Sequence, residues 1–179
     1  MQSIHDIVCE INESIPLTGE KYGVATPAIR GDQVIPSFKE KYIGIDDSFP
    51  VRIYHQLNGM VSSIRPNSGY GDDTGDYVTV FQMSMIVFNN QSLSKLKPDQ
   101  LVLFLQVNTP RKVESDTFKK ITITYNNAIL NDAQVFSQEY GSTDFRLKLN
   151  QNLIQINYTV EVTYINGCFA KCKEDFINN

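Results

Sequence analysis

The sequence predicts an α+β protein, built as a mostly antiparallel β-sheet with an N-terminal helix and one or two further helices packed on it. The first residues place apolar side chains at helical spacing, whereas several later segments alternate apolar and polar side chains as strands do. With 41% hydrophobic and 20% charged residues, the 179-residue chain can bury a core of its own. One domain over residues 1–179 is therefore expected.

Residues 3–15 carry the helical signal. Ser3 is the predicted N-cap, Asp6 completes a capping box three residues later, and Pro16 ends the helix. Cys9 is assigned to the apolar side of this helix as a small buried hydrophobe. The apolar face that defines the helix consists of Ile4, Ile7, Val8, Ile11 and Ile15.

Residues 17–48 differ in composition, because glycines and prolines recur among short apolar pieces. Gly31-Asp32 predicts a loose hairpin, and Pro36 places its second limb at a sheet edge. Such a segment has weak prospects of an independent core. We expect an extended arm or hairpin insertion that becomes ordered against a neighbouring subunit.

The middle of the chain alternates strongly. Residues 49–57 predict a strand that ends at the turn pair Asn58-Gly59, and residues 76–89 predict a long strand. Residues 66–76, which lie between them, lack apolar periodicity and predict an exposed acidic loop.

Beyond residue 90, the pattern permits either one helix from Ser92 or a fresh start at Pro98, and Pro98 in a first turn favours the fresh start. Residues 119–130 predict a strand with Asn126-Asn127 as a hairpin turn. The segment DAQVFSQEY is either a short helix or a strand, and FRLKLN alternates. Residues 153–165 show the cleanest alternation in the chain.

The C-terminal tail, residues 167–179, contains Cys168 and Cys172 four positions apart. A zinc site needs about four ligands, yet only two unpaired histidines are present, and a redox pair has two intervening residues rather than three. Packing of reduced, unmetallated sulfurs is the favoured interpretation. A disulfide and a metal clip are the alternatives.

No assembled catalytic or cofactor site is visible, so the sequence predicts a protein that is not an enzyme and binds no cofactor or metal. His55 has no serine, cysteine or carboxylate placed as its partner, and is interpreted as a satisfied or surface histidine. The acidic loop lacks the alternating ligands and terminal glutamate of a calcium loop. A net charge of −4 disfavours binding driven by the DNA backbone.

No run approaches the roughly 18 apolar residues that span a bilayer, and the first residues lack a secretory pattern. A membrane role is not expected, and a reducing cell interior is the expected setting.

The order of these pieces resembles that of the neck and tail-completion proteins of tailed bacteriophages, such as tail terminators and neck rings. The segments that show the resemblance are the short N-terminal helix, FPVRIYHQ, DYVTVFQMSMIVFN, the following helix, ITITYNNAILNDAQVFSQEY and INYTVEVTY. The last two, with the Asn/Ile/Tyr-rich composition, are most similar to ring proteins of crAss-like phages. The resemblance covers residues 3 to about 166 and is weakest over residues 17–48.

The resemblance implies a tail-terminator-like α+β fold and a structural role in the virion. Copies made in the host bacterial cytoplasm would form a ring of six or twelve, joining portal or connector to tail proteins around a channel through which DNA passes. It makes the 66–76 loop a candidate channel or docking element through Tyr70, Asp72, Asp73, Asp76 and Tyr77. The alternative is that this loop lies in solvent on the outside of the protein and contacts no partner. For the whole chain, the alternatives are a monomeric β-rich binding module and a small metal-dependent enzyme using Cys168, Cys172 and a histidine.

Overall fold

The computed structural model describes residues 3–31, 33–43, 48–65, 76–113, 118–130 and 151–164. The strands are β1 (Glu20–Val24), β2 (Thr26–Arg30), β3 (Gln33–Phe38), β4 (Lys41–Tyr42), β5 (Val51–Arg65), β6 (Asp76–Asn90), β7 (Lys112–Val113), β8 (Phe118–Leu130) and β9 (Gln151–Tyr164). The helices are α1 (Ile4–Ser14), α2 (Gln91–Ser94) and α3 (Pro98–Asn108). The predicted α+β class is confirmed.

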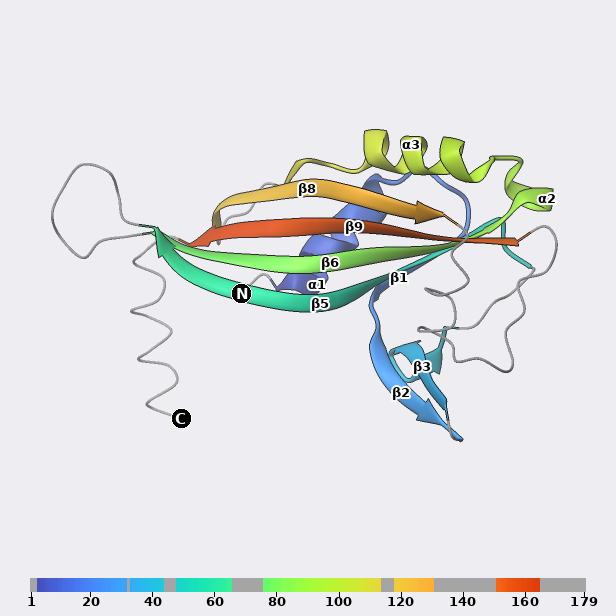
Figure 1. The fold of residues 1–179 in the computed structure, drawn as a ribbon, viewed down its shortest axis with the longest axis horizontal. Helices are drawn as coiled ribbons and strands as arrows, with labels where there is room; N and C mark the ends of the chain where they lie inside the picture. The colour runs from blue at the N-terminus through green and yellow to red at the C-terminus, as the bar shows by residue number, and fades with distance from the viewer. Residues whose placement is uncertain are drawn as a thin grey trace, which may run out of the picture.

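The main sheet has the strand order β1-β5-β6-β9-β8-β7, and a small second sheet has the order β2-β3-β4 (Figure 1). Among the strand pairs that the structure describes, the β1–β5 pair alone is parallel. The four long strands β5, β6, β9 and β8 are antiparallel to one another throughout. The chain therefore builds one long four-stranded ribbon with short strands added at both sides.

Helix α1 begins where the capping box predicts. Asp6 accepts a hydrogen bond from the Ser3 backbone N–H at 2.6 Å, and the helix ends at Ser14, before Pro16. The placement of Cys9 in the core is wrong, because its side chain is exposed. At 100° per residue, Cys9 lies roughly 140° from the centre of the apolar face, so it points away from the sheet.

Two predicted turns are also wrong. β5 runs without a break through Asn58-Gly59, and β8 runs through Asn126-Asn127. At both places the pairing register shifts by one residue, which is the mark of a β-bulge. A bulge accommodates an extra residue within a strand, so these asparagine pairs do not reverse the chain.

Both α1 and α3 cover one face of the main sheet, and Figure 1 shows α1 crossing behind the strands. Alternate residues of β5, β6, β8 and β9 form the large core with these helices, as the alternating patterns predicted. The prediction that a new helix starts at Pro98 is confirmed, because α2 ends at Ser94 and α3 begins at Pro98.

The small sheet covers part of the opposite face. Ile35 and Ile43 are buried against Tyr54, Ile86 and other residues of the main sheet. β2 and β3 pair as the hairpin predicted around Gly31-Asp32, but β3 is the middle strand and not an edge. Pro36 is tolerated there because β4 pairs only with the two residues that follow it, while the Pro36 carbonyl accepts from Ile43.

Three predicted features lie outside the described residues. These are most of the acidic loop, the segments DAQVFSQEY and FRLKLN, and the tail with Cys168 and Cys172. The contact of the 17–48 segment with another subunit stays a prediction.

Candidate functional site

An unpaired strand edge is the most unusual surface among the described residues. β1 pairs with β5 only as far as His55, so within the described ranges residues 57–63 of β5 have a paired neighbour on the β6 side alone. Six of these seven residues are exposed, and none is charged. Met60 and Val61 pair with Phe81 and Val80 on opposite faces of the sheet, yet they are 60% and 59% exposed. This segment is therefore open on its edge and on both faces.

The other side of the sheet also leaves a long strand incompletely paired. β7 covers β8 only at Ile121 and Thr122, so residues 124–130 have no strand partner on that side within the described ranges. β5 and β8 run in opposite directions, because three antiparallel pairings separate them. A β8 edge placed beside the β5 edge of an identical, equally oriented molecule would therefore continue the antiparallel order.

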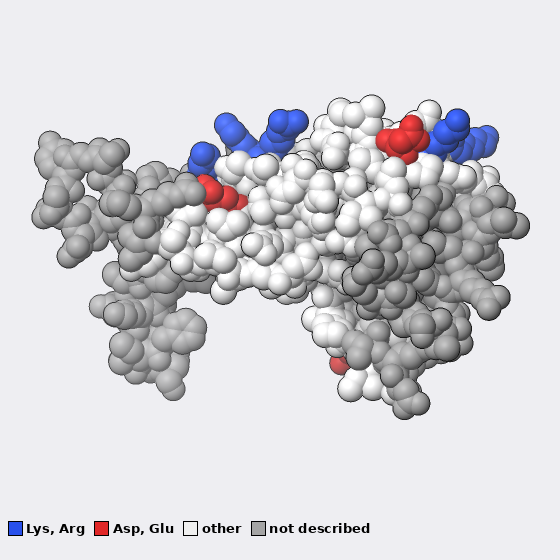
Figure 2. Space-filling model, viewed as in Figure 1, with Lys and Arg blue, Asp and Glu red and all other residues white. Residues whose placement is uncertain are grey.

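Beside the part that the small sheet covers, the middle of the sheet face opposite α1 is polar but carries few charges. A chain of hydrogen bonds crosses four strands there: Asn58 donates to Ser84 at 2.7 Å, Ser84 to Asn157 at 2.7 Å, and Asn157 to Asn127 at 3.0 Å. Gln155 donates to Asn157 at 2.8 Å. Figure 2 looks onto this face, and its middle is free of coloured, charged side chains.

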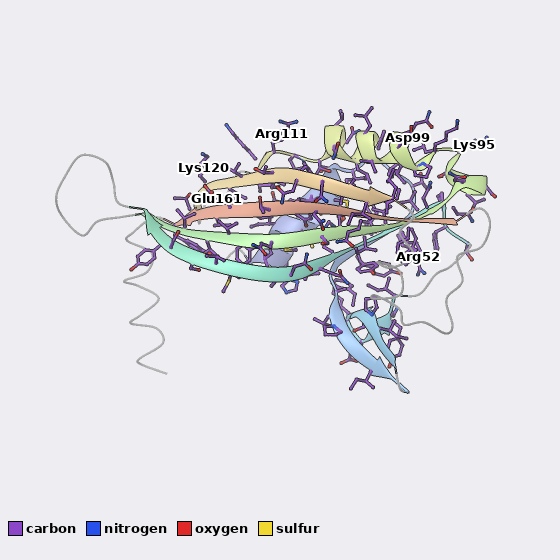
Figure 3. The ribbon with its side chains drawn as sticks, viewed as in Figure 1. Arg52, Lys95, Asp99, Arg111, Lys120 and Glu161 are labelled. Carbon is purple, nitrogen blue, oxygen red and sulfur yellow. The ribbon has the colours of Figure 1, made fainter. Side chains whose placement is uncertain are left out.

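Basic side chains gather instead beside α3. Figure 2 shows Lys and Arg along this border, and Figure 3 places Lys95 at one end of α3 and Arg111 at the other. Between these ends, the outer side of α3 exposes Leu103 and Val107, with 63% and 72% of their surfaces accessible. This mixture of cations and apolar side chains is a second candidate contact surface.

A groove of about 350 Å³ lies beside α1. Cys9 and Glu13 form its helical wall, and Gly23 and Phe38 contribute from β1 and β3. A Cβ on Gly23 would lie 2.6 Å from the Phe38 ring, so glycine is required for this close approach. Further lining residues are Asn12, Lys21 and Lys39.

His55 lies under this groove, fully buried, between Asn12 and Tyr158. The Asn12 amide nitrogen donates to the Tyr22 carbonyl at 2.8 Å, so its oxygen accepts from His55 Nε2 at 3.0 Å. His55 Nδ1 is then the acceptor, and the Tyr158 hydroxyl donates to it at 2.8 Å. The network links α1, β1, β5 and β9.

Burial lowers the pKa of His55 to about 3, and burial raises the pKa of Tyr158 well above its ordinary value. Both groups are therefore neutral near pH 7. The sequence-based view of His55 as a satisfied histidine is confirmed, since both ring nitrogens have partners. The neutral His55 ring, hydrogen-bonded at both nitrogens, therefore joins α1 and β9 to β5 in the core.

Of the predicted loop residues, Tyr70, Asp72 and Asp73 lie outside the described part of the chain. Asp76 and Tyr77 begin β6, where they pair with Arg65 and Ile64 of β5. The loop between residues 65 and 76 therefore joins the ends of the longest hairpin in the described structure. Whether its acidic side chains face a channel or a partner stays a prediction.

Within the described ranges, no group of three His, Cys, Asp or Glu side chains gathers closely enough to hold a metal ion. None of the helices seen there is long and apolar enough to cross a membrane. No protein-family model and no curated protein matches this chain.

Sequence reasoning missed both contact surfaces. It ended the strand at Asn58, so the edge of residues 57–63 was hidden, although the uncharged run QLNGMVSS was a signal for it. For α3, the signal was the run LVLFLQV, which is apolar on every side. A helix of that kind needs contacts on more than one face.

Proposed function

We propose that this chain is a structural subunit of a ring in the neck of a tailed bacteriophage, where it joins the portal or connector to the tail. The observation that carries the proposal is the open β5 edge of residues 57–63, exposed on both faces and without charge. Natural proteins protect free edges with charges, prolines or covering segments. An edge without that protection is suited to pairing with another chain.

The two sides of the sheet favour head-to-tail assembly. The β5 edge and the β8 edge are different surfaces, and a contact between different surfaces produces a ring when its rotation closes. The unpaired stretches, residues 57–63 of β5 and 124–130 of β8, lie at opposite ends of the sheet. Neighbouring copies that pair through them are therefore shifted along the strand direction, like the staggered strands of a closed barrel.

The polar sheet face supports the conduit part of the proposal. Amide and hydroxyl groups there are paired with one another through Ser84 and Asn157, and few charges interrupt them. A lumen of this kind has little attraction for phosphates, so DNA can pass without being retained. The resemblance to neck and tail-completion proteins supplies the location in the virion.

The test is self-assembly of the purified chain, followed by light scattering after size exclusion and by negative-stain imaging. We expect closed rings that revert to monomers in the double variant Met60→Lys/Val61→Lys, because edge lysines oppose strand pairing. The control is Ser92→Lys/Leu93→Lys, which places two lysines at exposed positions of α2, away from the β5 edge. A wild-type chain that stays monomeric at high concentration would contradict the proposal, as would rings that persist in the edge variant.

A further inference from the structure

Helix α3 is apolar on the side that faces away from its own core. Leu101 and Leu105 are fully buried under the helix, whereas Leu103 and Val107 lie on the other side and are mostly exposed. Leu103 and Val107 are four residues apart, so they form one ridge. An exposed apolar ridge on a helix that already has a buried side indicates a second packing partner.

Basic residues lie at both ends of this ridge. Lys95 and Lys97 precede α3, and Arg111 and Lys112 follow it. Asp99, in the first turn of α3, is the acidic residue on this side. None of the four basic residues forms an ion pair within the described part of the chain. Because the whole chain carries a charge of −4, these cations stand on an otherwise acidic protein. The ridge with its four basic residues is called the α3 surface below.

The outer side of α1 has the opposite charge. Asp6, Glu10 and Glu13 follow one another at spacings of four and three, so they share the helix face turned away from the sheet. Cys9 is exposed at the middle of this face. The groove of about 350 Å³ opens beside Cys9 and Glu13, with Phe38 as an apolar wall. Lys21 and Lys39 also line it, so the acidic character of this side comes from the helix and not from the groove. This side of α1 and its groove are called the α1 surface.

We propose that the α3 surface of one copy packs against the α1 surface of the next copy, with Leu103 and Val107 seated at the groove. The proposal rests on the ring proposed above and names a helix–helix contact within it. The two helices have equal lengths of eleven residues, with Leu103 and Cys9 at their centres. The contact therefore brings Leu103 beside the small Cys9 side chain.

Charge sets the direction of the pair. An antiparallel arrangement brings Lys97 toward the Glu13 end of α1 and Arg111 toward its Asp6 end. Asp99, in the first turn of α3, also comes near Glu13, so the attraction at that end depends on the two lysines that precede the helix. The antiparallel arrangement also sets the positive N-terminus of one helix dipole near the negative C-terminus of the other. Figure 1 shows α1 and α3 running in opposite senses along the strands, and copies repeated without reversal keep that relation.

A protein partner fits the α3 surface better than a nucleic acid does. The most exposed part of the ridge is apolar, and phosphate groups offer nothing to bury against Leu103 or Val107. A second copy supplies both the acidic residues and the groove. Surfaces that are complementary but different are also what a head-to-tail ring requires.

Cross-linking tests the contact directly. In a background of Cys168→Ser and Cys172→Ser, the variant Leu103→Cys should form a disulfide with the native Cys9 of the neighbouring copy under mild oxidation. The same chain with Cys9→Ser should not. Leu93→Cys, exposed to 49% on α2, is the control for accidental encounters. Cross-linking of Leu93→Cys as efficiently as Leu103→Cys would overturn the contact.

Charge exchange tests the direction. Lys97→Glu should weaken self-association about tenfold, and adding Glu13→Lys should restore most of it. A glutamate at this position suits the start of α3, so loss of the helix would not explain the weakening.

The outcomes separate the two proposals. Rings without the Cys9 cross-link overturn this contact alone, whereas cross-linked chains that never close support the contact and overturn the ring. A monomer without a cross-link overturns both. If Lys97→Glu lowers retention of the purified protein on double-stranded DNA while the association constant is unchanged, the α3 surface binds nucleic acid and the contact is overturned.

Discussion

The Tyr158 hydroxyl donates a hydrogen bond of 2.8 Å to Nδ1 of His55, although the two residues are 103 positions apart in the chain. The two rings meet edge to face, with centroids 5.9 Å apart. Tyr125 packs on the other side of Tyr158 at the same centroid distance. This pair connects β5 with β9 across the intervening strand β6, under α1, and makes the core depend on a neutral histidine.

Protonation of His55 should destabilise the fold. Its pKa is about 3 in the folded protein and ordinarily about 6.5, so between these values the unfolded chain binds a proton that the folded chain does not. Stability should therefore fall as the pH drops below 6.5, by about 1.4 kcal/mol per pH unit. Urea unfolding between pH 6.5 and 5 measures this slope, because most carboxylates stay ionised there. His55→Gln should flatten it, and an unchanged slope would contradict the assignment.

Removal of the Tyr158 hydroxyl should cost more stability than removal of the Tyr125 hydroxyl. Tyr158→Phe leaves the buried Nδ1 of His55 without its donor, at a cost of about 1–3 kcal/mol. The buried Tyr125 hydroxyl forms no hydrogen bond of normal geometry within the described residues, although Thr109 is near enough to oppose the burial that raises its pKa. Tyr125→Phe should therefore be close to neutral. Denaturant midpoints of the two variants provide the comparison. Equal losses would argue that both hydroxyls act only through packing.

Gly19 should not tolerate a side chain. A Cβ at this position would lie 2.0 Å from the Val51 carbonyl oxygen, so Gly19→Ala must displace β1 from β5. We expect a loss of more than about 3 kcal/mol of stability. Gly31→Ala is the matched control, because nothing lies within 4 Å there and only the positive φ of 61° opposes it. That strain costs about 1–2 kcal/mol, and a Gly19 variant as stable as this control would refute the clash.

The acidic loop should be separable from folding. Replacement of residues 68–75 by a two-residue turn keeps the β5–β6 register, which extends from Arg65–Asp76 to Val51–Asn89. We expect an unchanged circular dichroism spectrum. If the chain has the phage-neck role proposed above, we also expect a defect in particle assembly or DNA ejection, measured by imaging and infectivity. Normal particles with normal ejection would leave only the solvated outer loop as its role.

Local chemistry accounts for what the sequence determined by itself. The capping box of Ser3 and Asp6, the helix start at Pro98 and the alternation along β9 were all predicted, because each depends on residues within a few positions of one another. The α+β class followed from these patterns together. His55 could be recognised as lacking a catalytic partner, but its actual partners could not be named.

Tertiary structure decided which strands are neighbours, and with that the register, the burial and the edges. Asn58-Gly59 and Asn126-Asn127 have the composition of turns, yet each lies within a strand because pairing with β6 or β9 resumes beyond the bulge. Cys9 is exposed because the sheet meets the other side of α1. The open edge of β5 exists because β1 stops opposite His55. Long-range pairing of this kind leaves no mark on local periodicity, since a strand alternates in the same way whether or not its edge is paired.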